Sequence, residues 1–368
     1  MTRTLIVDAR ELWKSGLGRY TREITVRLVR RAAFGEVVLA GNVVELETWI
    51  ARECLTGVRV VEVKGGRYSL ASQMGWTRLA RTLPRDSVVW FPHWDAPVVY
   101  FGPPTVVTVH DLIHLRVAGV ASPLRRFVVR VLLRFATRRA RRIVTDAEFT
   151  RRDLLSLKPS LAGRIDVVPC GVSARFLAPP DDDALPLGVV APYLLAVGNR
   201  KHHKNLVAAV EVLARLRADD PSLTLVVGGD HFPEWAEVLH RAESLGVRHA
   251  IVDLPHVSDA ALAALYRGAE CLLFPSRYEG FGLPVLEAMA CGAPVVAANT
   301  TSIPEVAGNA ALLFAPDDVE GMANAVRRLQ TDTELRRRLI DAGRSRAAAF
   351  TWDNAAEQLE RVLLDVSS

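Results

Sequence analysis

The sequence lacks the features that mark membrane-spanning, secreted and metal-binding proteins. No apolar run approaches the roughly 20 residues that span a bilayer. The first apolar run, at 4–7, is too short for a signal peptide and precedes no small-residue cleavage site. The 368 residues include only four cysteines, which form no Cys-x-x-Cys pair. We therefore expect a cytoplasmic protein with reduced thiols, no cofactor and no metal site.

A large excess of one charge is also missing. The net charge is +5, and much of it comes from arginines in 123–142. No motif that reads nucleic acid accompanies this segment, so we expect no nucleic-acid partner. Half of the residues are hydrophobic, which predicts a folded globular protein, and the length suits two domains.

The first half of the chain alternates Val/Ile/Leu-rich runs with amphipathic segments, a pattern typical of buried parallel sheets covered by helices. Strands are expected at 4–9, 36–41, 87–91, 105–110, 141–147 and 164–171, and helices at 19–33 and 123–140. The segment 176–192 is rich in Pro and Asp and has neither period, so it is interpreted as a linker.

The alternation restarts after this linker. Strands are expected at 193–198, 223–229, 250–254, 271–276, 293–298 and 310–315, and helices at 204–218, 233–245, 258–269, 284–291, 317–330 and 353–366. The predicted fold is α/β with two doubly wound, Rossmann-like domains. The predicted N-terminal domain comprises 1–175 and the predicted C-terminal domain comprises 193–350, with the linker 176–192 between them. A C-terminal helix is expected at 351–368.

The most informative stretch is SRYEGFGLPVLEAMACG, which carries Glu279 and Glu287. Pro284 suits the first turn of a helix, and Gly292 suits its end. The turn before this helix then lies at the carboxyl end of a buried strand, where α/β sheets bind ligands. Helix N-termini favour phosphates, and carboxylates accept charge-assisted hydrogen bonds from diols. A nucleotide-sugar has both groups, although two solvated charges at a helix start remain an alternative.

The spacing of Glu279 and Glu287 resembles the E-x7-E signature of family 4 of the retaining glycosyltransferases. Further blocks of the chain look like this family's, in its order: SGLGRYTREI, TVVTVHDLIHL, IVTDAEFTRRDL, VVPCGV, VGNRKHHKNL and NTTSIPEVAGNAALLFAPDD. The resemblance implies the GT-B fold, with two domains facing across a cleft. It also implies an N-terminal domain that binds the acceptor and a C-terminal helix that crosses back onto it.

The resemblance further implies the residues that bind the donor sugar nucleotide. Lys204 occupies the position of a phosphate-binding lysine, and Glu279 faces the sugar while Glu287 reaches the ribose. Asn199 and His203 stand where the family usually has an arginine. Either Arg200 or Lys201 substitutes for it, or His203 itself binds weakly. The other expected donor contacts are Gly16, Gly18, Gly280, Phe281, Gly282, Leu283 and Val257. The alternative for Gly16 and Gly18 is a flexible loop before a helix.

Four residues of the N-terminal half follow predicted strands. His110 matches a histidine that lies next to the transferred sugar in this family, although lone histidines are more often structural. Asp111 follows it, and His93 and Asp95 end the preceding strand. These last three are proposed as acceptor contacts on position alone. Cys170 stands where the family commonly has asparagine and is interpreted as packing, because no activating base is evident.

The segment 123–142 has apolar residues at helical spacing, with arginines on the other positions: Leu124, Phe127, Val128, Val131, Leu132 and Phe135. One interpretation is a helix packed on the core with a solvated basic face. The other is a peripheral contact with anionic lipid at the inner face of the membrane.

We therefore predict a retaining hexosyltransferase that acts on a glycan or lipid-linked hydroxyl, with mannose from GDP-mannose as the first candidate. The resemblance implies a front-face reaction without an enzymatic nucleophile, with His110, Lys204 and Glu279 in catalytic positions. No Asp-x-Asp cluster suggests a metal. The alternatives are a nucleotide-sugar epimerase of the same fold, a non-catalytic sugar-nucleotide binder, and a dehydrogenase, which would need a complete glycine fingerprint.

Overall fold

The computed structural model describes residues 3–13, 15–179 and 185–366, and these form two compact units. Unit 1 comprises 1–116, 121–171 and 352–368, and unit 2 comprises 117–120 and 172–351. The boundary between the units therefore falls after Gly171, and the described part of the predicted linker 176–192 belongs to unit 2. Within the described residues, no helix is long and apolar enough to cross a membrane.

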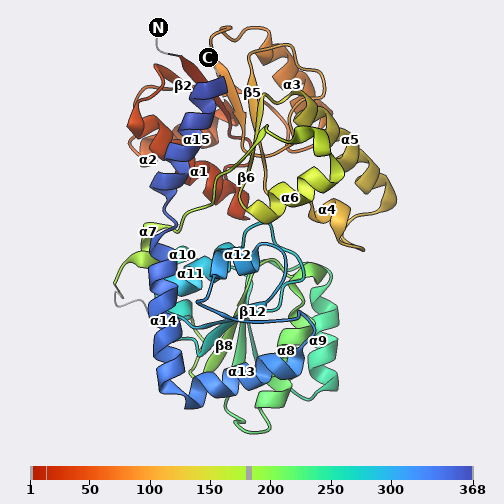
Figure 1. Ribbon diagram of the computed structural model, residues 1–368, viewed down its shortest axis with the longest axis vertical. Helices are drawn as coiled ribbons and strands as arrows, with labels where there is room; N and C mark the ends of the chain where they lie inside the picture. Colours follow the sequence, from red (N-terminus) through yellow and green to blue (C-terminus); the bar gives the residue numbers. More distant parts are fainter. Residues whose placement is uncertain (1–2, 14, 180–184, 367–368) are drawn as a thin grey trace. The chain divides into compact units, whose positions relative to one another are not determined.

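Unit 1 contains a parallel sheet of seven strands in the order β3-β2-β1-β4-β5-β6-β7 (Figure 1). The strands are β1 (Thr4–Asp8), β2 (Glu36–Gly41), β3 (Val58–Glu62), β4 (Val88–Phe91), β5 (Thr105–Val109), β6 (Arg142–Thr145) and β7 (Ile165–Val167). The longer helices are α1 (Ser15–Arg31), α2 (Val43–Arg52), α3 (Leu70–Ala80), α5 (Pro123–Arg139), α6 (Glu148–Leu157) and α15 (Trp352–Val366). The short helices α4 (Ile113–Arg116) and η1 (Pro159–Leu161) complete the unit.

Successive side chains of a strand point to opposite faces, and both faces of this sheet are buried. Phe91 packs with Trp76 of α3 on one face. On the other face, Trp90 packs edge to face against Tyr20 of α1, which also contacts Trp352 of α15. Helix α15 thus returns to unit 1 although it follows unit 2 in the chain.

Unit 2 contains a parallel sheet of six strands in the order β10-β9-β8-β11-β12-β13. The strands are β8 (Tyr193–Val197), β9 (Thr224–Gly228), β10 (Ile251–Leu254), β11 (Cys271–Phe274), β12 (Val295–Ala298) and β13 (Leu312–Phe314). The helices are α7 (Ala174–Leu177), η2 (His202–Lys204), α8 (Leu206–Leu216), α9 (Trp235–Ser244), η3 (Arg248–Ala250), α10 (Asp259–Gly268), α11 (Leu283–Cys291), α12 (Ile303–Ala307), α13 (Val319–Thr331) and α14 (Thr333–Ala348).

The strand order of unit 2 places a switch point between β8 and β11. The chain builds β8, β9 and β10 toward one edge of the sheet and then returns to build β11, β12 and β13 toward the other. Helices diverge at such a point, and the strands' carboxyl ends there form a crevice that binds ligands in open α/β sheets. The loops that follow β8 and β11 contain Lys204 and Glu279, so the fold brings the two predicted donor-binding segments together.

Candidate functional site

The central feature of the site in unit 2 is an ion pair between Lys204 and Glu279. Lys204 Nζ lies 2.7 Å from Glu279 Oε1, and the two side chains are only 10% and 12% exposed. The ammonium also lies 5.0 Å from the centre of the Phe274 ring. Gly198 has φ +135°, and a Cβ there would lie 2.9 Å from Lys204 Cε. Glycine at this position therefore leaves the room that the lysine side chain needs.

Hydroxyl groups hold the turn that carries Glu279. The backbone N–H of Glu279 donates to Thr301 Oγ1 at 3.1 Å. The Ser302 hydroxyl, fully buried, lies within hydrogen-bond distance of the Glu279 and Phe281 carbonyl oxygens, at 3.0 and 2.9 Å. The sequence analysis assigned Thr301 and Ser302 no role, although both belong to the NTTSIPEVAG block. They position the carboxylate from the loop after the neighbouring strand β12.

The turn leads directly into helix α11. Gly282 is its N-cap with φ +108°, and Leu283 and Pro284 follow as its first residues. Gly280 and Gly282 therefore lie where the prediction required, at a helix N-terminus beside the carboxylate. The Phe281 side chain is buried and packs edge to face on Phe350 at 5.9 Å. Only the backbone of Phe281 is thus available to a ligand in this structure.

The second carboxylate of the motif is buried. The Glu287 side chain lies in α11, only 3% of the residue is exposed, and the buried Tyr266 hydroxyl donates to Glu287 Oε2 at 3.1 Å. Tyr266 comes from α10, so a helix of the same unit fixes the orientation of the carboxylate. No motif in the sequence points to this tyrosine. Contact of Glu287 with a ribose stays a prediction.

Arg200 is held by side chains of unit 2. Its side chain is fully buried, forms a 2.6 Å ion pair with Asp253, and stacks 4.1 Å from the centre of the Trp235 ring. Arg200 also donates to the Val227 carbonyl at 3.1 Å. The Asp253 pKa is lowered, because hydrogen bonds from Arg200 and His231 outweigh the opposing effect of burial. In this structure the arginine ties the β8 loop to β10, and contact of Arg200 with the donor stays a prediction.

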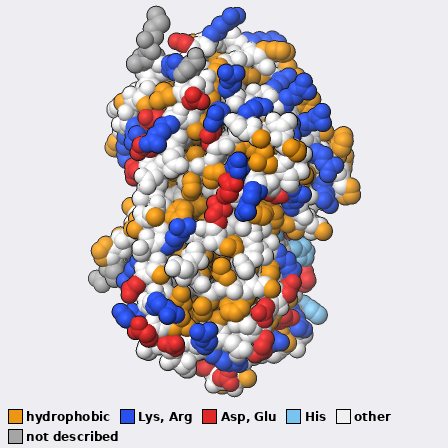
Figure 2. Space-filling model, in the orientation of Figure 1, with side chains coloured by type: hydrophobic (Ala, Val, Ile, Leu, Met, Phe, Trp, Pro, Cys, Tyr) orange, Lys and Arg blue, Asp and Glu red, His pale blue; other side chains and the backbone are white. Residues whose placement is uncertain are grey.

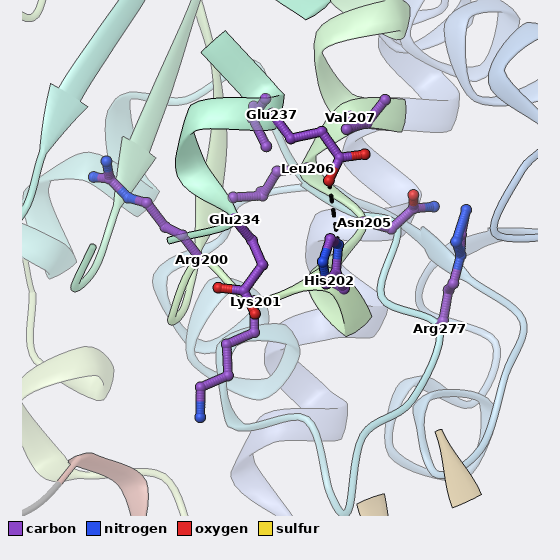
Figure 3. Close-up of a pocket in the computed structure, with 10 residues that line it drawn as sticks. Arg200, Lys201, His202, Asn205, Leu206, Val207, Glu234, Glu237 and Arg277 are labelled. Atoms are coloured by element: carbon purple, nitrogen blue, oxygen red, sulfur yellow. Dashed lines mark ion pairs between the residues drawn. The ribbon is translucent and has the colours of Figure 1, made fainter. Parts of the chain in front are cut away.

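A pocket of about 180 Å³ lies beside the predicted donor-binding loop, between η2, the start of α8 and the start of α9 (Figure 3). Its walls carry charges of both signs, and His202 Nδ1 lies 3.4 Å from Glu237 Oε2 across it. The lining residues are Arg200, Lys201, His202, Asn205, Leu206, Val207, Glu234, Glu237, Val238 and Arg277. Neither Lys204 nor Glu279 lines it, so this hollow is separate from the ion pair.

The predicted nucleobase loop follows β10. Val257 is half-buried, and a Cβ placed on Gly228 would lie 3.5 Å from its Cγ2 atom. The neighbouring His256 is exposed and lies 3.3 Å from Asp230. The loop thus lies at the carboxyl end of the same sheet as Lys204, although contact with a nucleobase stays a prediction.

In unit 1, both ring nitrogens of His110 face oxygen atoms. Nδ1 lies 2.5 Å from Asp146 Oδ2, and Nε2 lies 2.7 Å from the Pro92 carbonyl oxygen. Burial opposes the charged form, but the charge and hydrogen bond of Asp146 outweigh it, so the pKa of His110 is raised above its ordinary value. A carbonyl and a carboxylate only accept hydrogen bonds, so this geometry fits an imidazolium. The sequence analysis did not single out Asp146.

The predicted acceptor residues are tied into unit 1. Asp95 is buried, accepts a 3.0 Å hydrogen bond from the Tyr68 N–H and lies 3.5 Å from Arg10. Burial raises the pKa of Asp95 to about 6, against the opposing charge of Arg10. His93 Nδ1 accepts from the Asp95 N–H at 3.1 Å, and burial lowers the pKa of His93, so the ring is neutral.

The remaining predicted residues of unit 1 have structural contacts. Asp111 Oδ1 accepts from the Ile113 N–H at 3.0 Å and so caps α4. Gly16 and Gly18 lie inside the first turn of α1, which begins at Ser15 and not after these glycines as predicted. A Cβ on Gly18 would lie 2.4 Å from the Leu12 carbonyl oxygen, so the close approach of that backbone requires glycine.

Two further predictions concern cysteine and metal. Cys170 is buried, and burial raises the pKa of its thiol well above the ordinary value, which makes it a poor nucleophile. Among the residues that the structure describes, no group of three or more His, Cys, Asp and Glu side chains could hold a metal ion. Independence from metal stays a prediction.

The architecture defines the class of protein. The structure is similar over 99% of both chains to sucrose-phosphate synthase from Thermosynechococcus elongatus, with a TM-score of 0.79 at 19% identity. Two parallel α/β units with this similarity constitute the GT-B fold, which confirms the predicted fold class.

The sequence comparisons identify the family. A family model described as "Glycosyltransferase Family 4" matches residues 14–176, and one described as "Glycosyl transferases group 1" matches residues 182–346. O-antigen chain mannosyltransferase B of Escherichia coli is 27% identical over 94% of each chain. D-inositol 3-phosphate glycosyltransferase of Actinosynnema mirum is 31% identical, and the match covers 81% of this chain and 71% of the relative. The chain belongs to the family 4-like glycosyltransferases with the GT-B fold.

Proposed function

We propose that this glycosyltransferase moves a hexose from a nucleotide-sugar to a hydroxyl group with retention of the anomeric configuration. The observation that carries the proposal is the Lys204–Glu279 pair, which lies at the switch point of unit 2 beside the N-terminus of α11. Lys204 and the helix N-terminus would bind the diphosphate, and Glu279 would accept hydrogen bonds from the sugar hydroxyls.

In this proposal the protein acts by positioning and by charge. The leaving diphosphate gains negative charge as the bond to the sugar breaks, and a fixed ammonium group stabilises that charge. Lys204 is already held in place by Glu279 before a ligand arrives, so little reorganisation is needed. No side chain is assigned as a nucleophile, and no metal is required by the proposal. His110 would act as a cation rather than as a base, because its two nitrogens already face acceptors.

We propose mannose from GDP-mannose as the first donor to test. The support is that the relatives include mannosyltransferases, one of which is 27% identical over 94% of each chain. The acceptor is proposed to be a glycan or a lipid-linked sugar that contacts unit 1 near His93, Asp95 and Asp111. We further propose a cytoplasmic location with peripheral contact between 123–142 and an anionic membrane.

The donor is identified by thermal-shift measurements against a panel of nucleotide-sugars. A ligand at a hundred times its Kd stabilises the native state by about 2.7 kcal/mol. That corresponds to a rise of roughly 5–10 °C in the Tm of a domain of 150–250 residues. We expect GDP-mannose to give the largest rise and Lys204→Ala to abolish it. If no nucleotide-sugar of the panel raises the Tm, the proposed donor site is refuted.

A second assay separates the transferase from its alternatives. We expect consumption of the donor to require an acceptor. An epimerase would convert the nucleotide-sugar without an acceptor, and a non-catalytic binder would leave it unchanged under both conditions.

A further inference from the structure

Helix α5 has two apolar stripes on opposite sides. Val129, Leu133 and Ala136 are buried and belong to the core of unit 1. Successive residues of a helix are about 100° apart, so a second stripe, formed by Leu124, Phe127, Val128 and Phe135, lies roughly half a turn around α5 from these core residues. Its large side chains are exposed: Leu124 by 73%, Phe127 by 62%, Val128 by 41% and Phe135 by 37%. Leu124, Phe127 and Phe135 therefore face away from the core. Val131 and Leu132 are half-buried, and Leu132 packs against the core of unit 1.

Arginines border this outer stripe on both sides. Helix α5 contains six arginines and no acidic residue. Arg130, Arg134 and Arg138 follow one border, and Arg125 and Arg139 follow the other, by the same helical geometry. In the described part of the chain, none of these five forms an ion pair with a carboxylate. Figure 2 shows basic and hydrophobic side chains interleaved over the part of unit 1 where Figure 1 places α5.

The exposed apolar surface continues beyond α5. Arg139 donates to the Tyr100 carbonyl at 3.5 Å, which joins the end of α5 to the loop 98–101. Val99 and Phe101 of this loop are 49% and 68% exposed. The loop is in turn bound to α3, since Thr77 Oγ1 donates to the Val99 carbonyl at 2.7 Å. Leu70 and Met74, on the same face of α3 as Thr77, are 82% and 54% exposed. We call these exposed residues of α5, loop 98–101 and α3 the basic apolar face.

The chemistry of this face selects one kind of partner. A second copy of the chain would bring arginines against arginines, and no acidic residue of α5 would compensate them. A nucleic acid would neutralise the arginines but leave the Leu and Phe side chains without an apolar environment. An anionic bilayer satisfies both, because apolar side chains enter the acyl boundary while arginines reach the phosphate groups of the lipids.

We propose that the basic apolar face docks unit 1 onto a bilayer that contains anionic lipid. The docking rests on the proposed function, because that function requires an acceptor and the docking concerns where the acceptor is found. Arg126 of α5 donates to the Leu115 carbonyl of α4 at 2.9 Å, and Asp111 caps that same helix. These contacts join α4, which carries the predicted acceptor residue Asp111, to the helix that docks. A sugar carried on a membrane lipid is the acceptor class that fits this placement.

The test is co-sedimentation of the full chain with vesicles, without donor or acceptor. We expect binding to vesicles of phosphatidylcholine mixed with phosphatidylglycerol, and at least tenfold weaker binding to phosphatidylcholine alone. High salt should weaken binding, because it screens the arginines. The double variant Phe127→Glu/Phe135→Glu should lose binding at low salt, and Arg130→Gln/Arg134→Gln/Arg138→Gln should lose the preference for anionic lipid.

Val44→Glu is the matched control, because Val44 of α2 is 74% exposed and lies outside this face. It should bind vesicles like the wild type. Equal binding by the wild type and the Phe variant would overturn the proposal. The proposal would also be overturned if, in sedimentation velocity without vesicles, the wild type is a dimer and the Phe127→Glu/Phe135→Glu variant is a monomer. Donor-induced thermal shifts of all variants are measured in parallel, so failure of docking is distinguishable from failure of the donor site.

Discussion

The Lys204–Glu279 pair permits a test that separates a catalytic role from a structural one. The perturbation is a double-mutant cycle of Lys204→Ala, Glu279→Ala and the variant that carries both changes. In such a cycle the coupling between two side chains is measured separately for each property. If the pair serves only to hold the fold, stability and turnover should respond in parallel.

The expected loss of stability follows from the geometry. Removing one partner of a fully buried ion pair costs about 3–5 kcal/mol, because the other charge is left uncompensated. Here the partners lie 2.7 Å apart, and their side chains are 10% and 12% exposed. Partial access to water reduces the cost, so we expect about 2–3 kcal/mol for each single variant. The double variant leaves neither charge, and it should be no less stable than the single variants.

Turnover should respond differently. Loss of one preorganised group that stabilises transition-state charge typically lowers kcat by about 10²–10³. We expect reductions of this size in both single variants. The double variant should be at least as inactive as either of them, even though it recovers stability. Stability is measured by urea denaturation of the full chain, and turnover is measured as donor consumption with acceptor present.

The control is the exposed pair of Arg327 and Asp219 in the same unit, whose side chains are 36% and 62% exposed. Its alanine variants should change stability by less than about 1 kcal/mol and leave turnover unchanged. If the Lys204→Ala/Glu279→Ala variant is both more stable and more active than the single variants, the proposed catalytic role of the pair is refuted.

Two further predictions concern residues outside this pair. The pKa of His110 is raised in the folded state. Its pair with Asp146 therefore stabilises unit 1 fully when the pH is below the pKa of the unfolded state, about 6.5. This stabilisation is lost as the pH rises through the pKa of the folded state. Denaturation at a series of pH values should show this loss in the wild type but not in Asp146→Asn; identical profiles would contradict the pairing. Arg200→Met should lower stability by about 1–3 kcal/mol, because Asp253 loses a charged hydrogen bond, yet leave the donor Kd within about twofold. A tenfold weaker Kd at unchanged Tm would show that Arg200 binds the donor after all.

The sequence predicted the positions of strand ends better than the directions of side chains. Runs such as EVVLAG at 36–41 and CLLF at 271–274 are apolar because both faces of a parallel sheet are buried, and this pattern is visible without the structure. Lys204 and Glu279 follow two such strands, so the sequence predicts that both lie at the carboxyl end of a sheet; the structure shows that these two strands are neighbours. Their pairing within 2.7 Å could not, since it depends on the rotamers and on Gly198.

Several elements were not predicted. Helix α14 has five arginines among its 16 residues, and only four of its residues are buried, so its apolar period is weak. Helices α2 and α3 and the edge strand β3 lie in the segment 43–80, where no strong pattern was recognised. The role of Asp146 was also missed, because its contact with His110 joins residues 36 positions apart through the pairing of β5 with β6.

Helix α5 shows why the rotation of a helix is harder to predict than its ends. Its boundaries at 123 and 139 agree with the prediction of 123–140 within one residue, since Ser122 caps the start and Pro123 follows. Both of its stripes have helical spacing, so periodicity alone could not decide which one faces the core. The structure buries the stripe of Val129, Leu133 and Ala136, which has no aromatic residue, and exposes Leu124, Phe127 and Phe135. Cores usually take the larger apolar side chains. The stripe with the larger side chains is left outside, bordered by arginines, and we infer that its burial is completed by a lipid surface rather than by the chain itself.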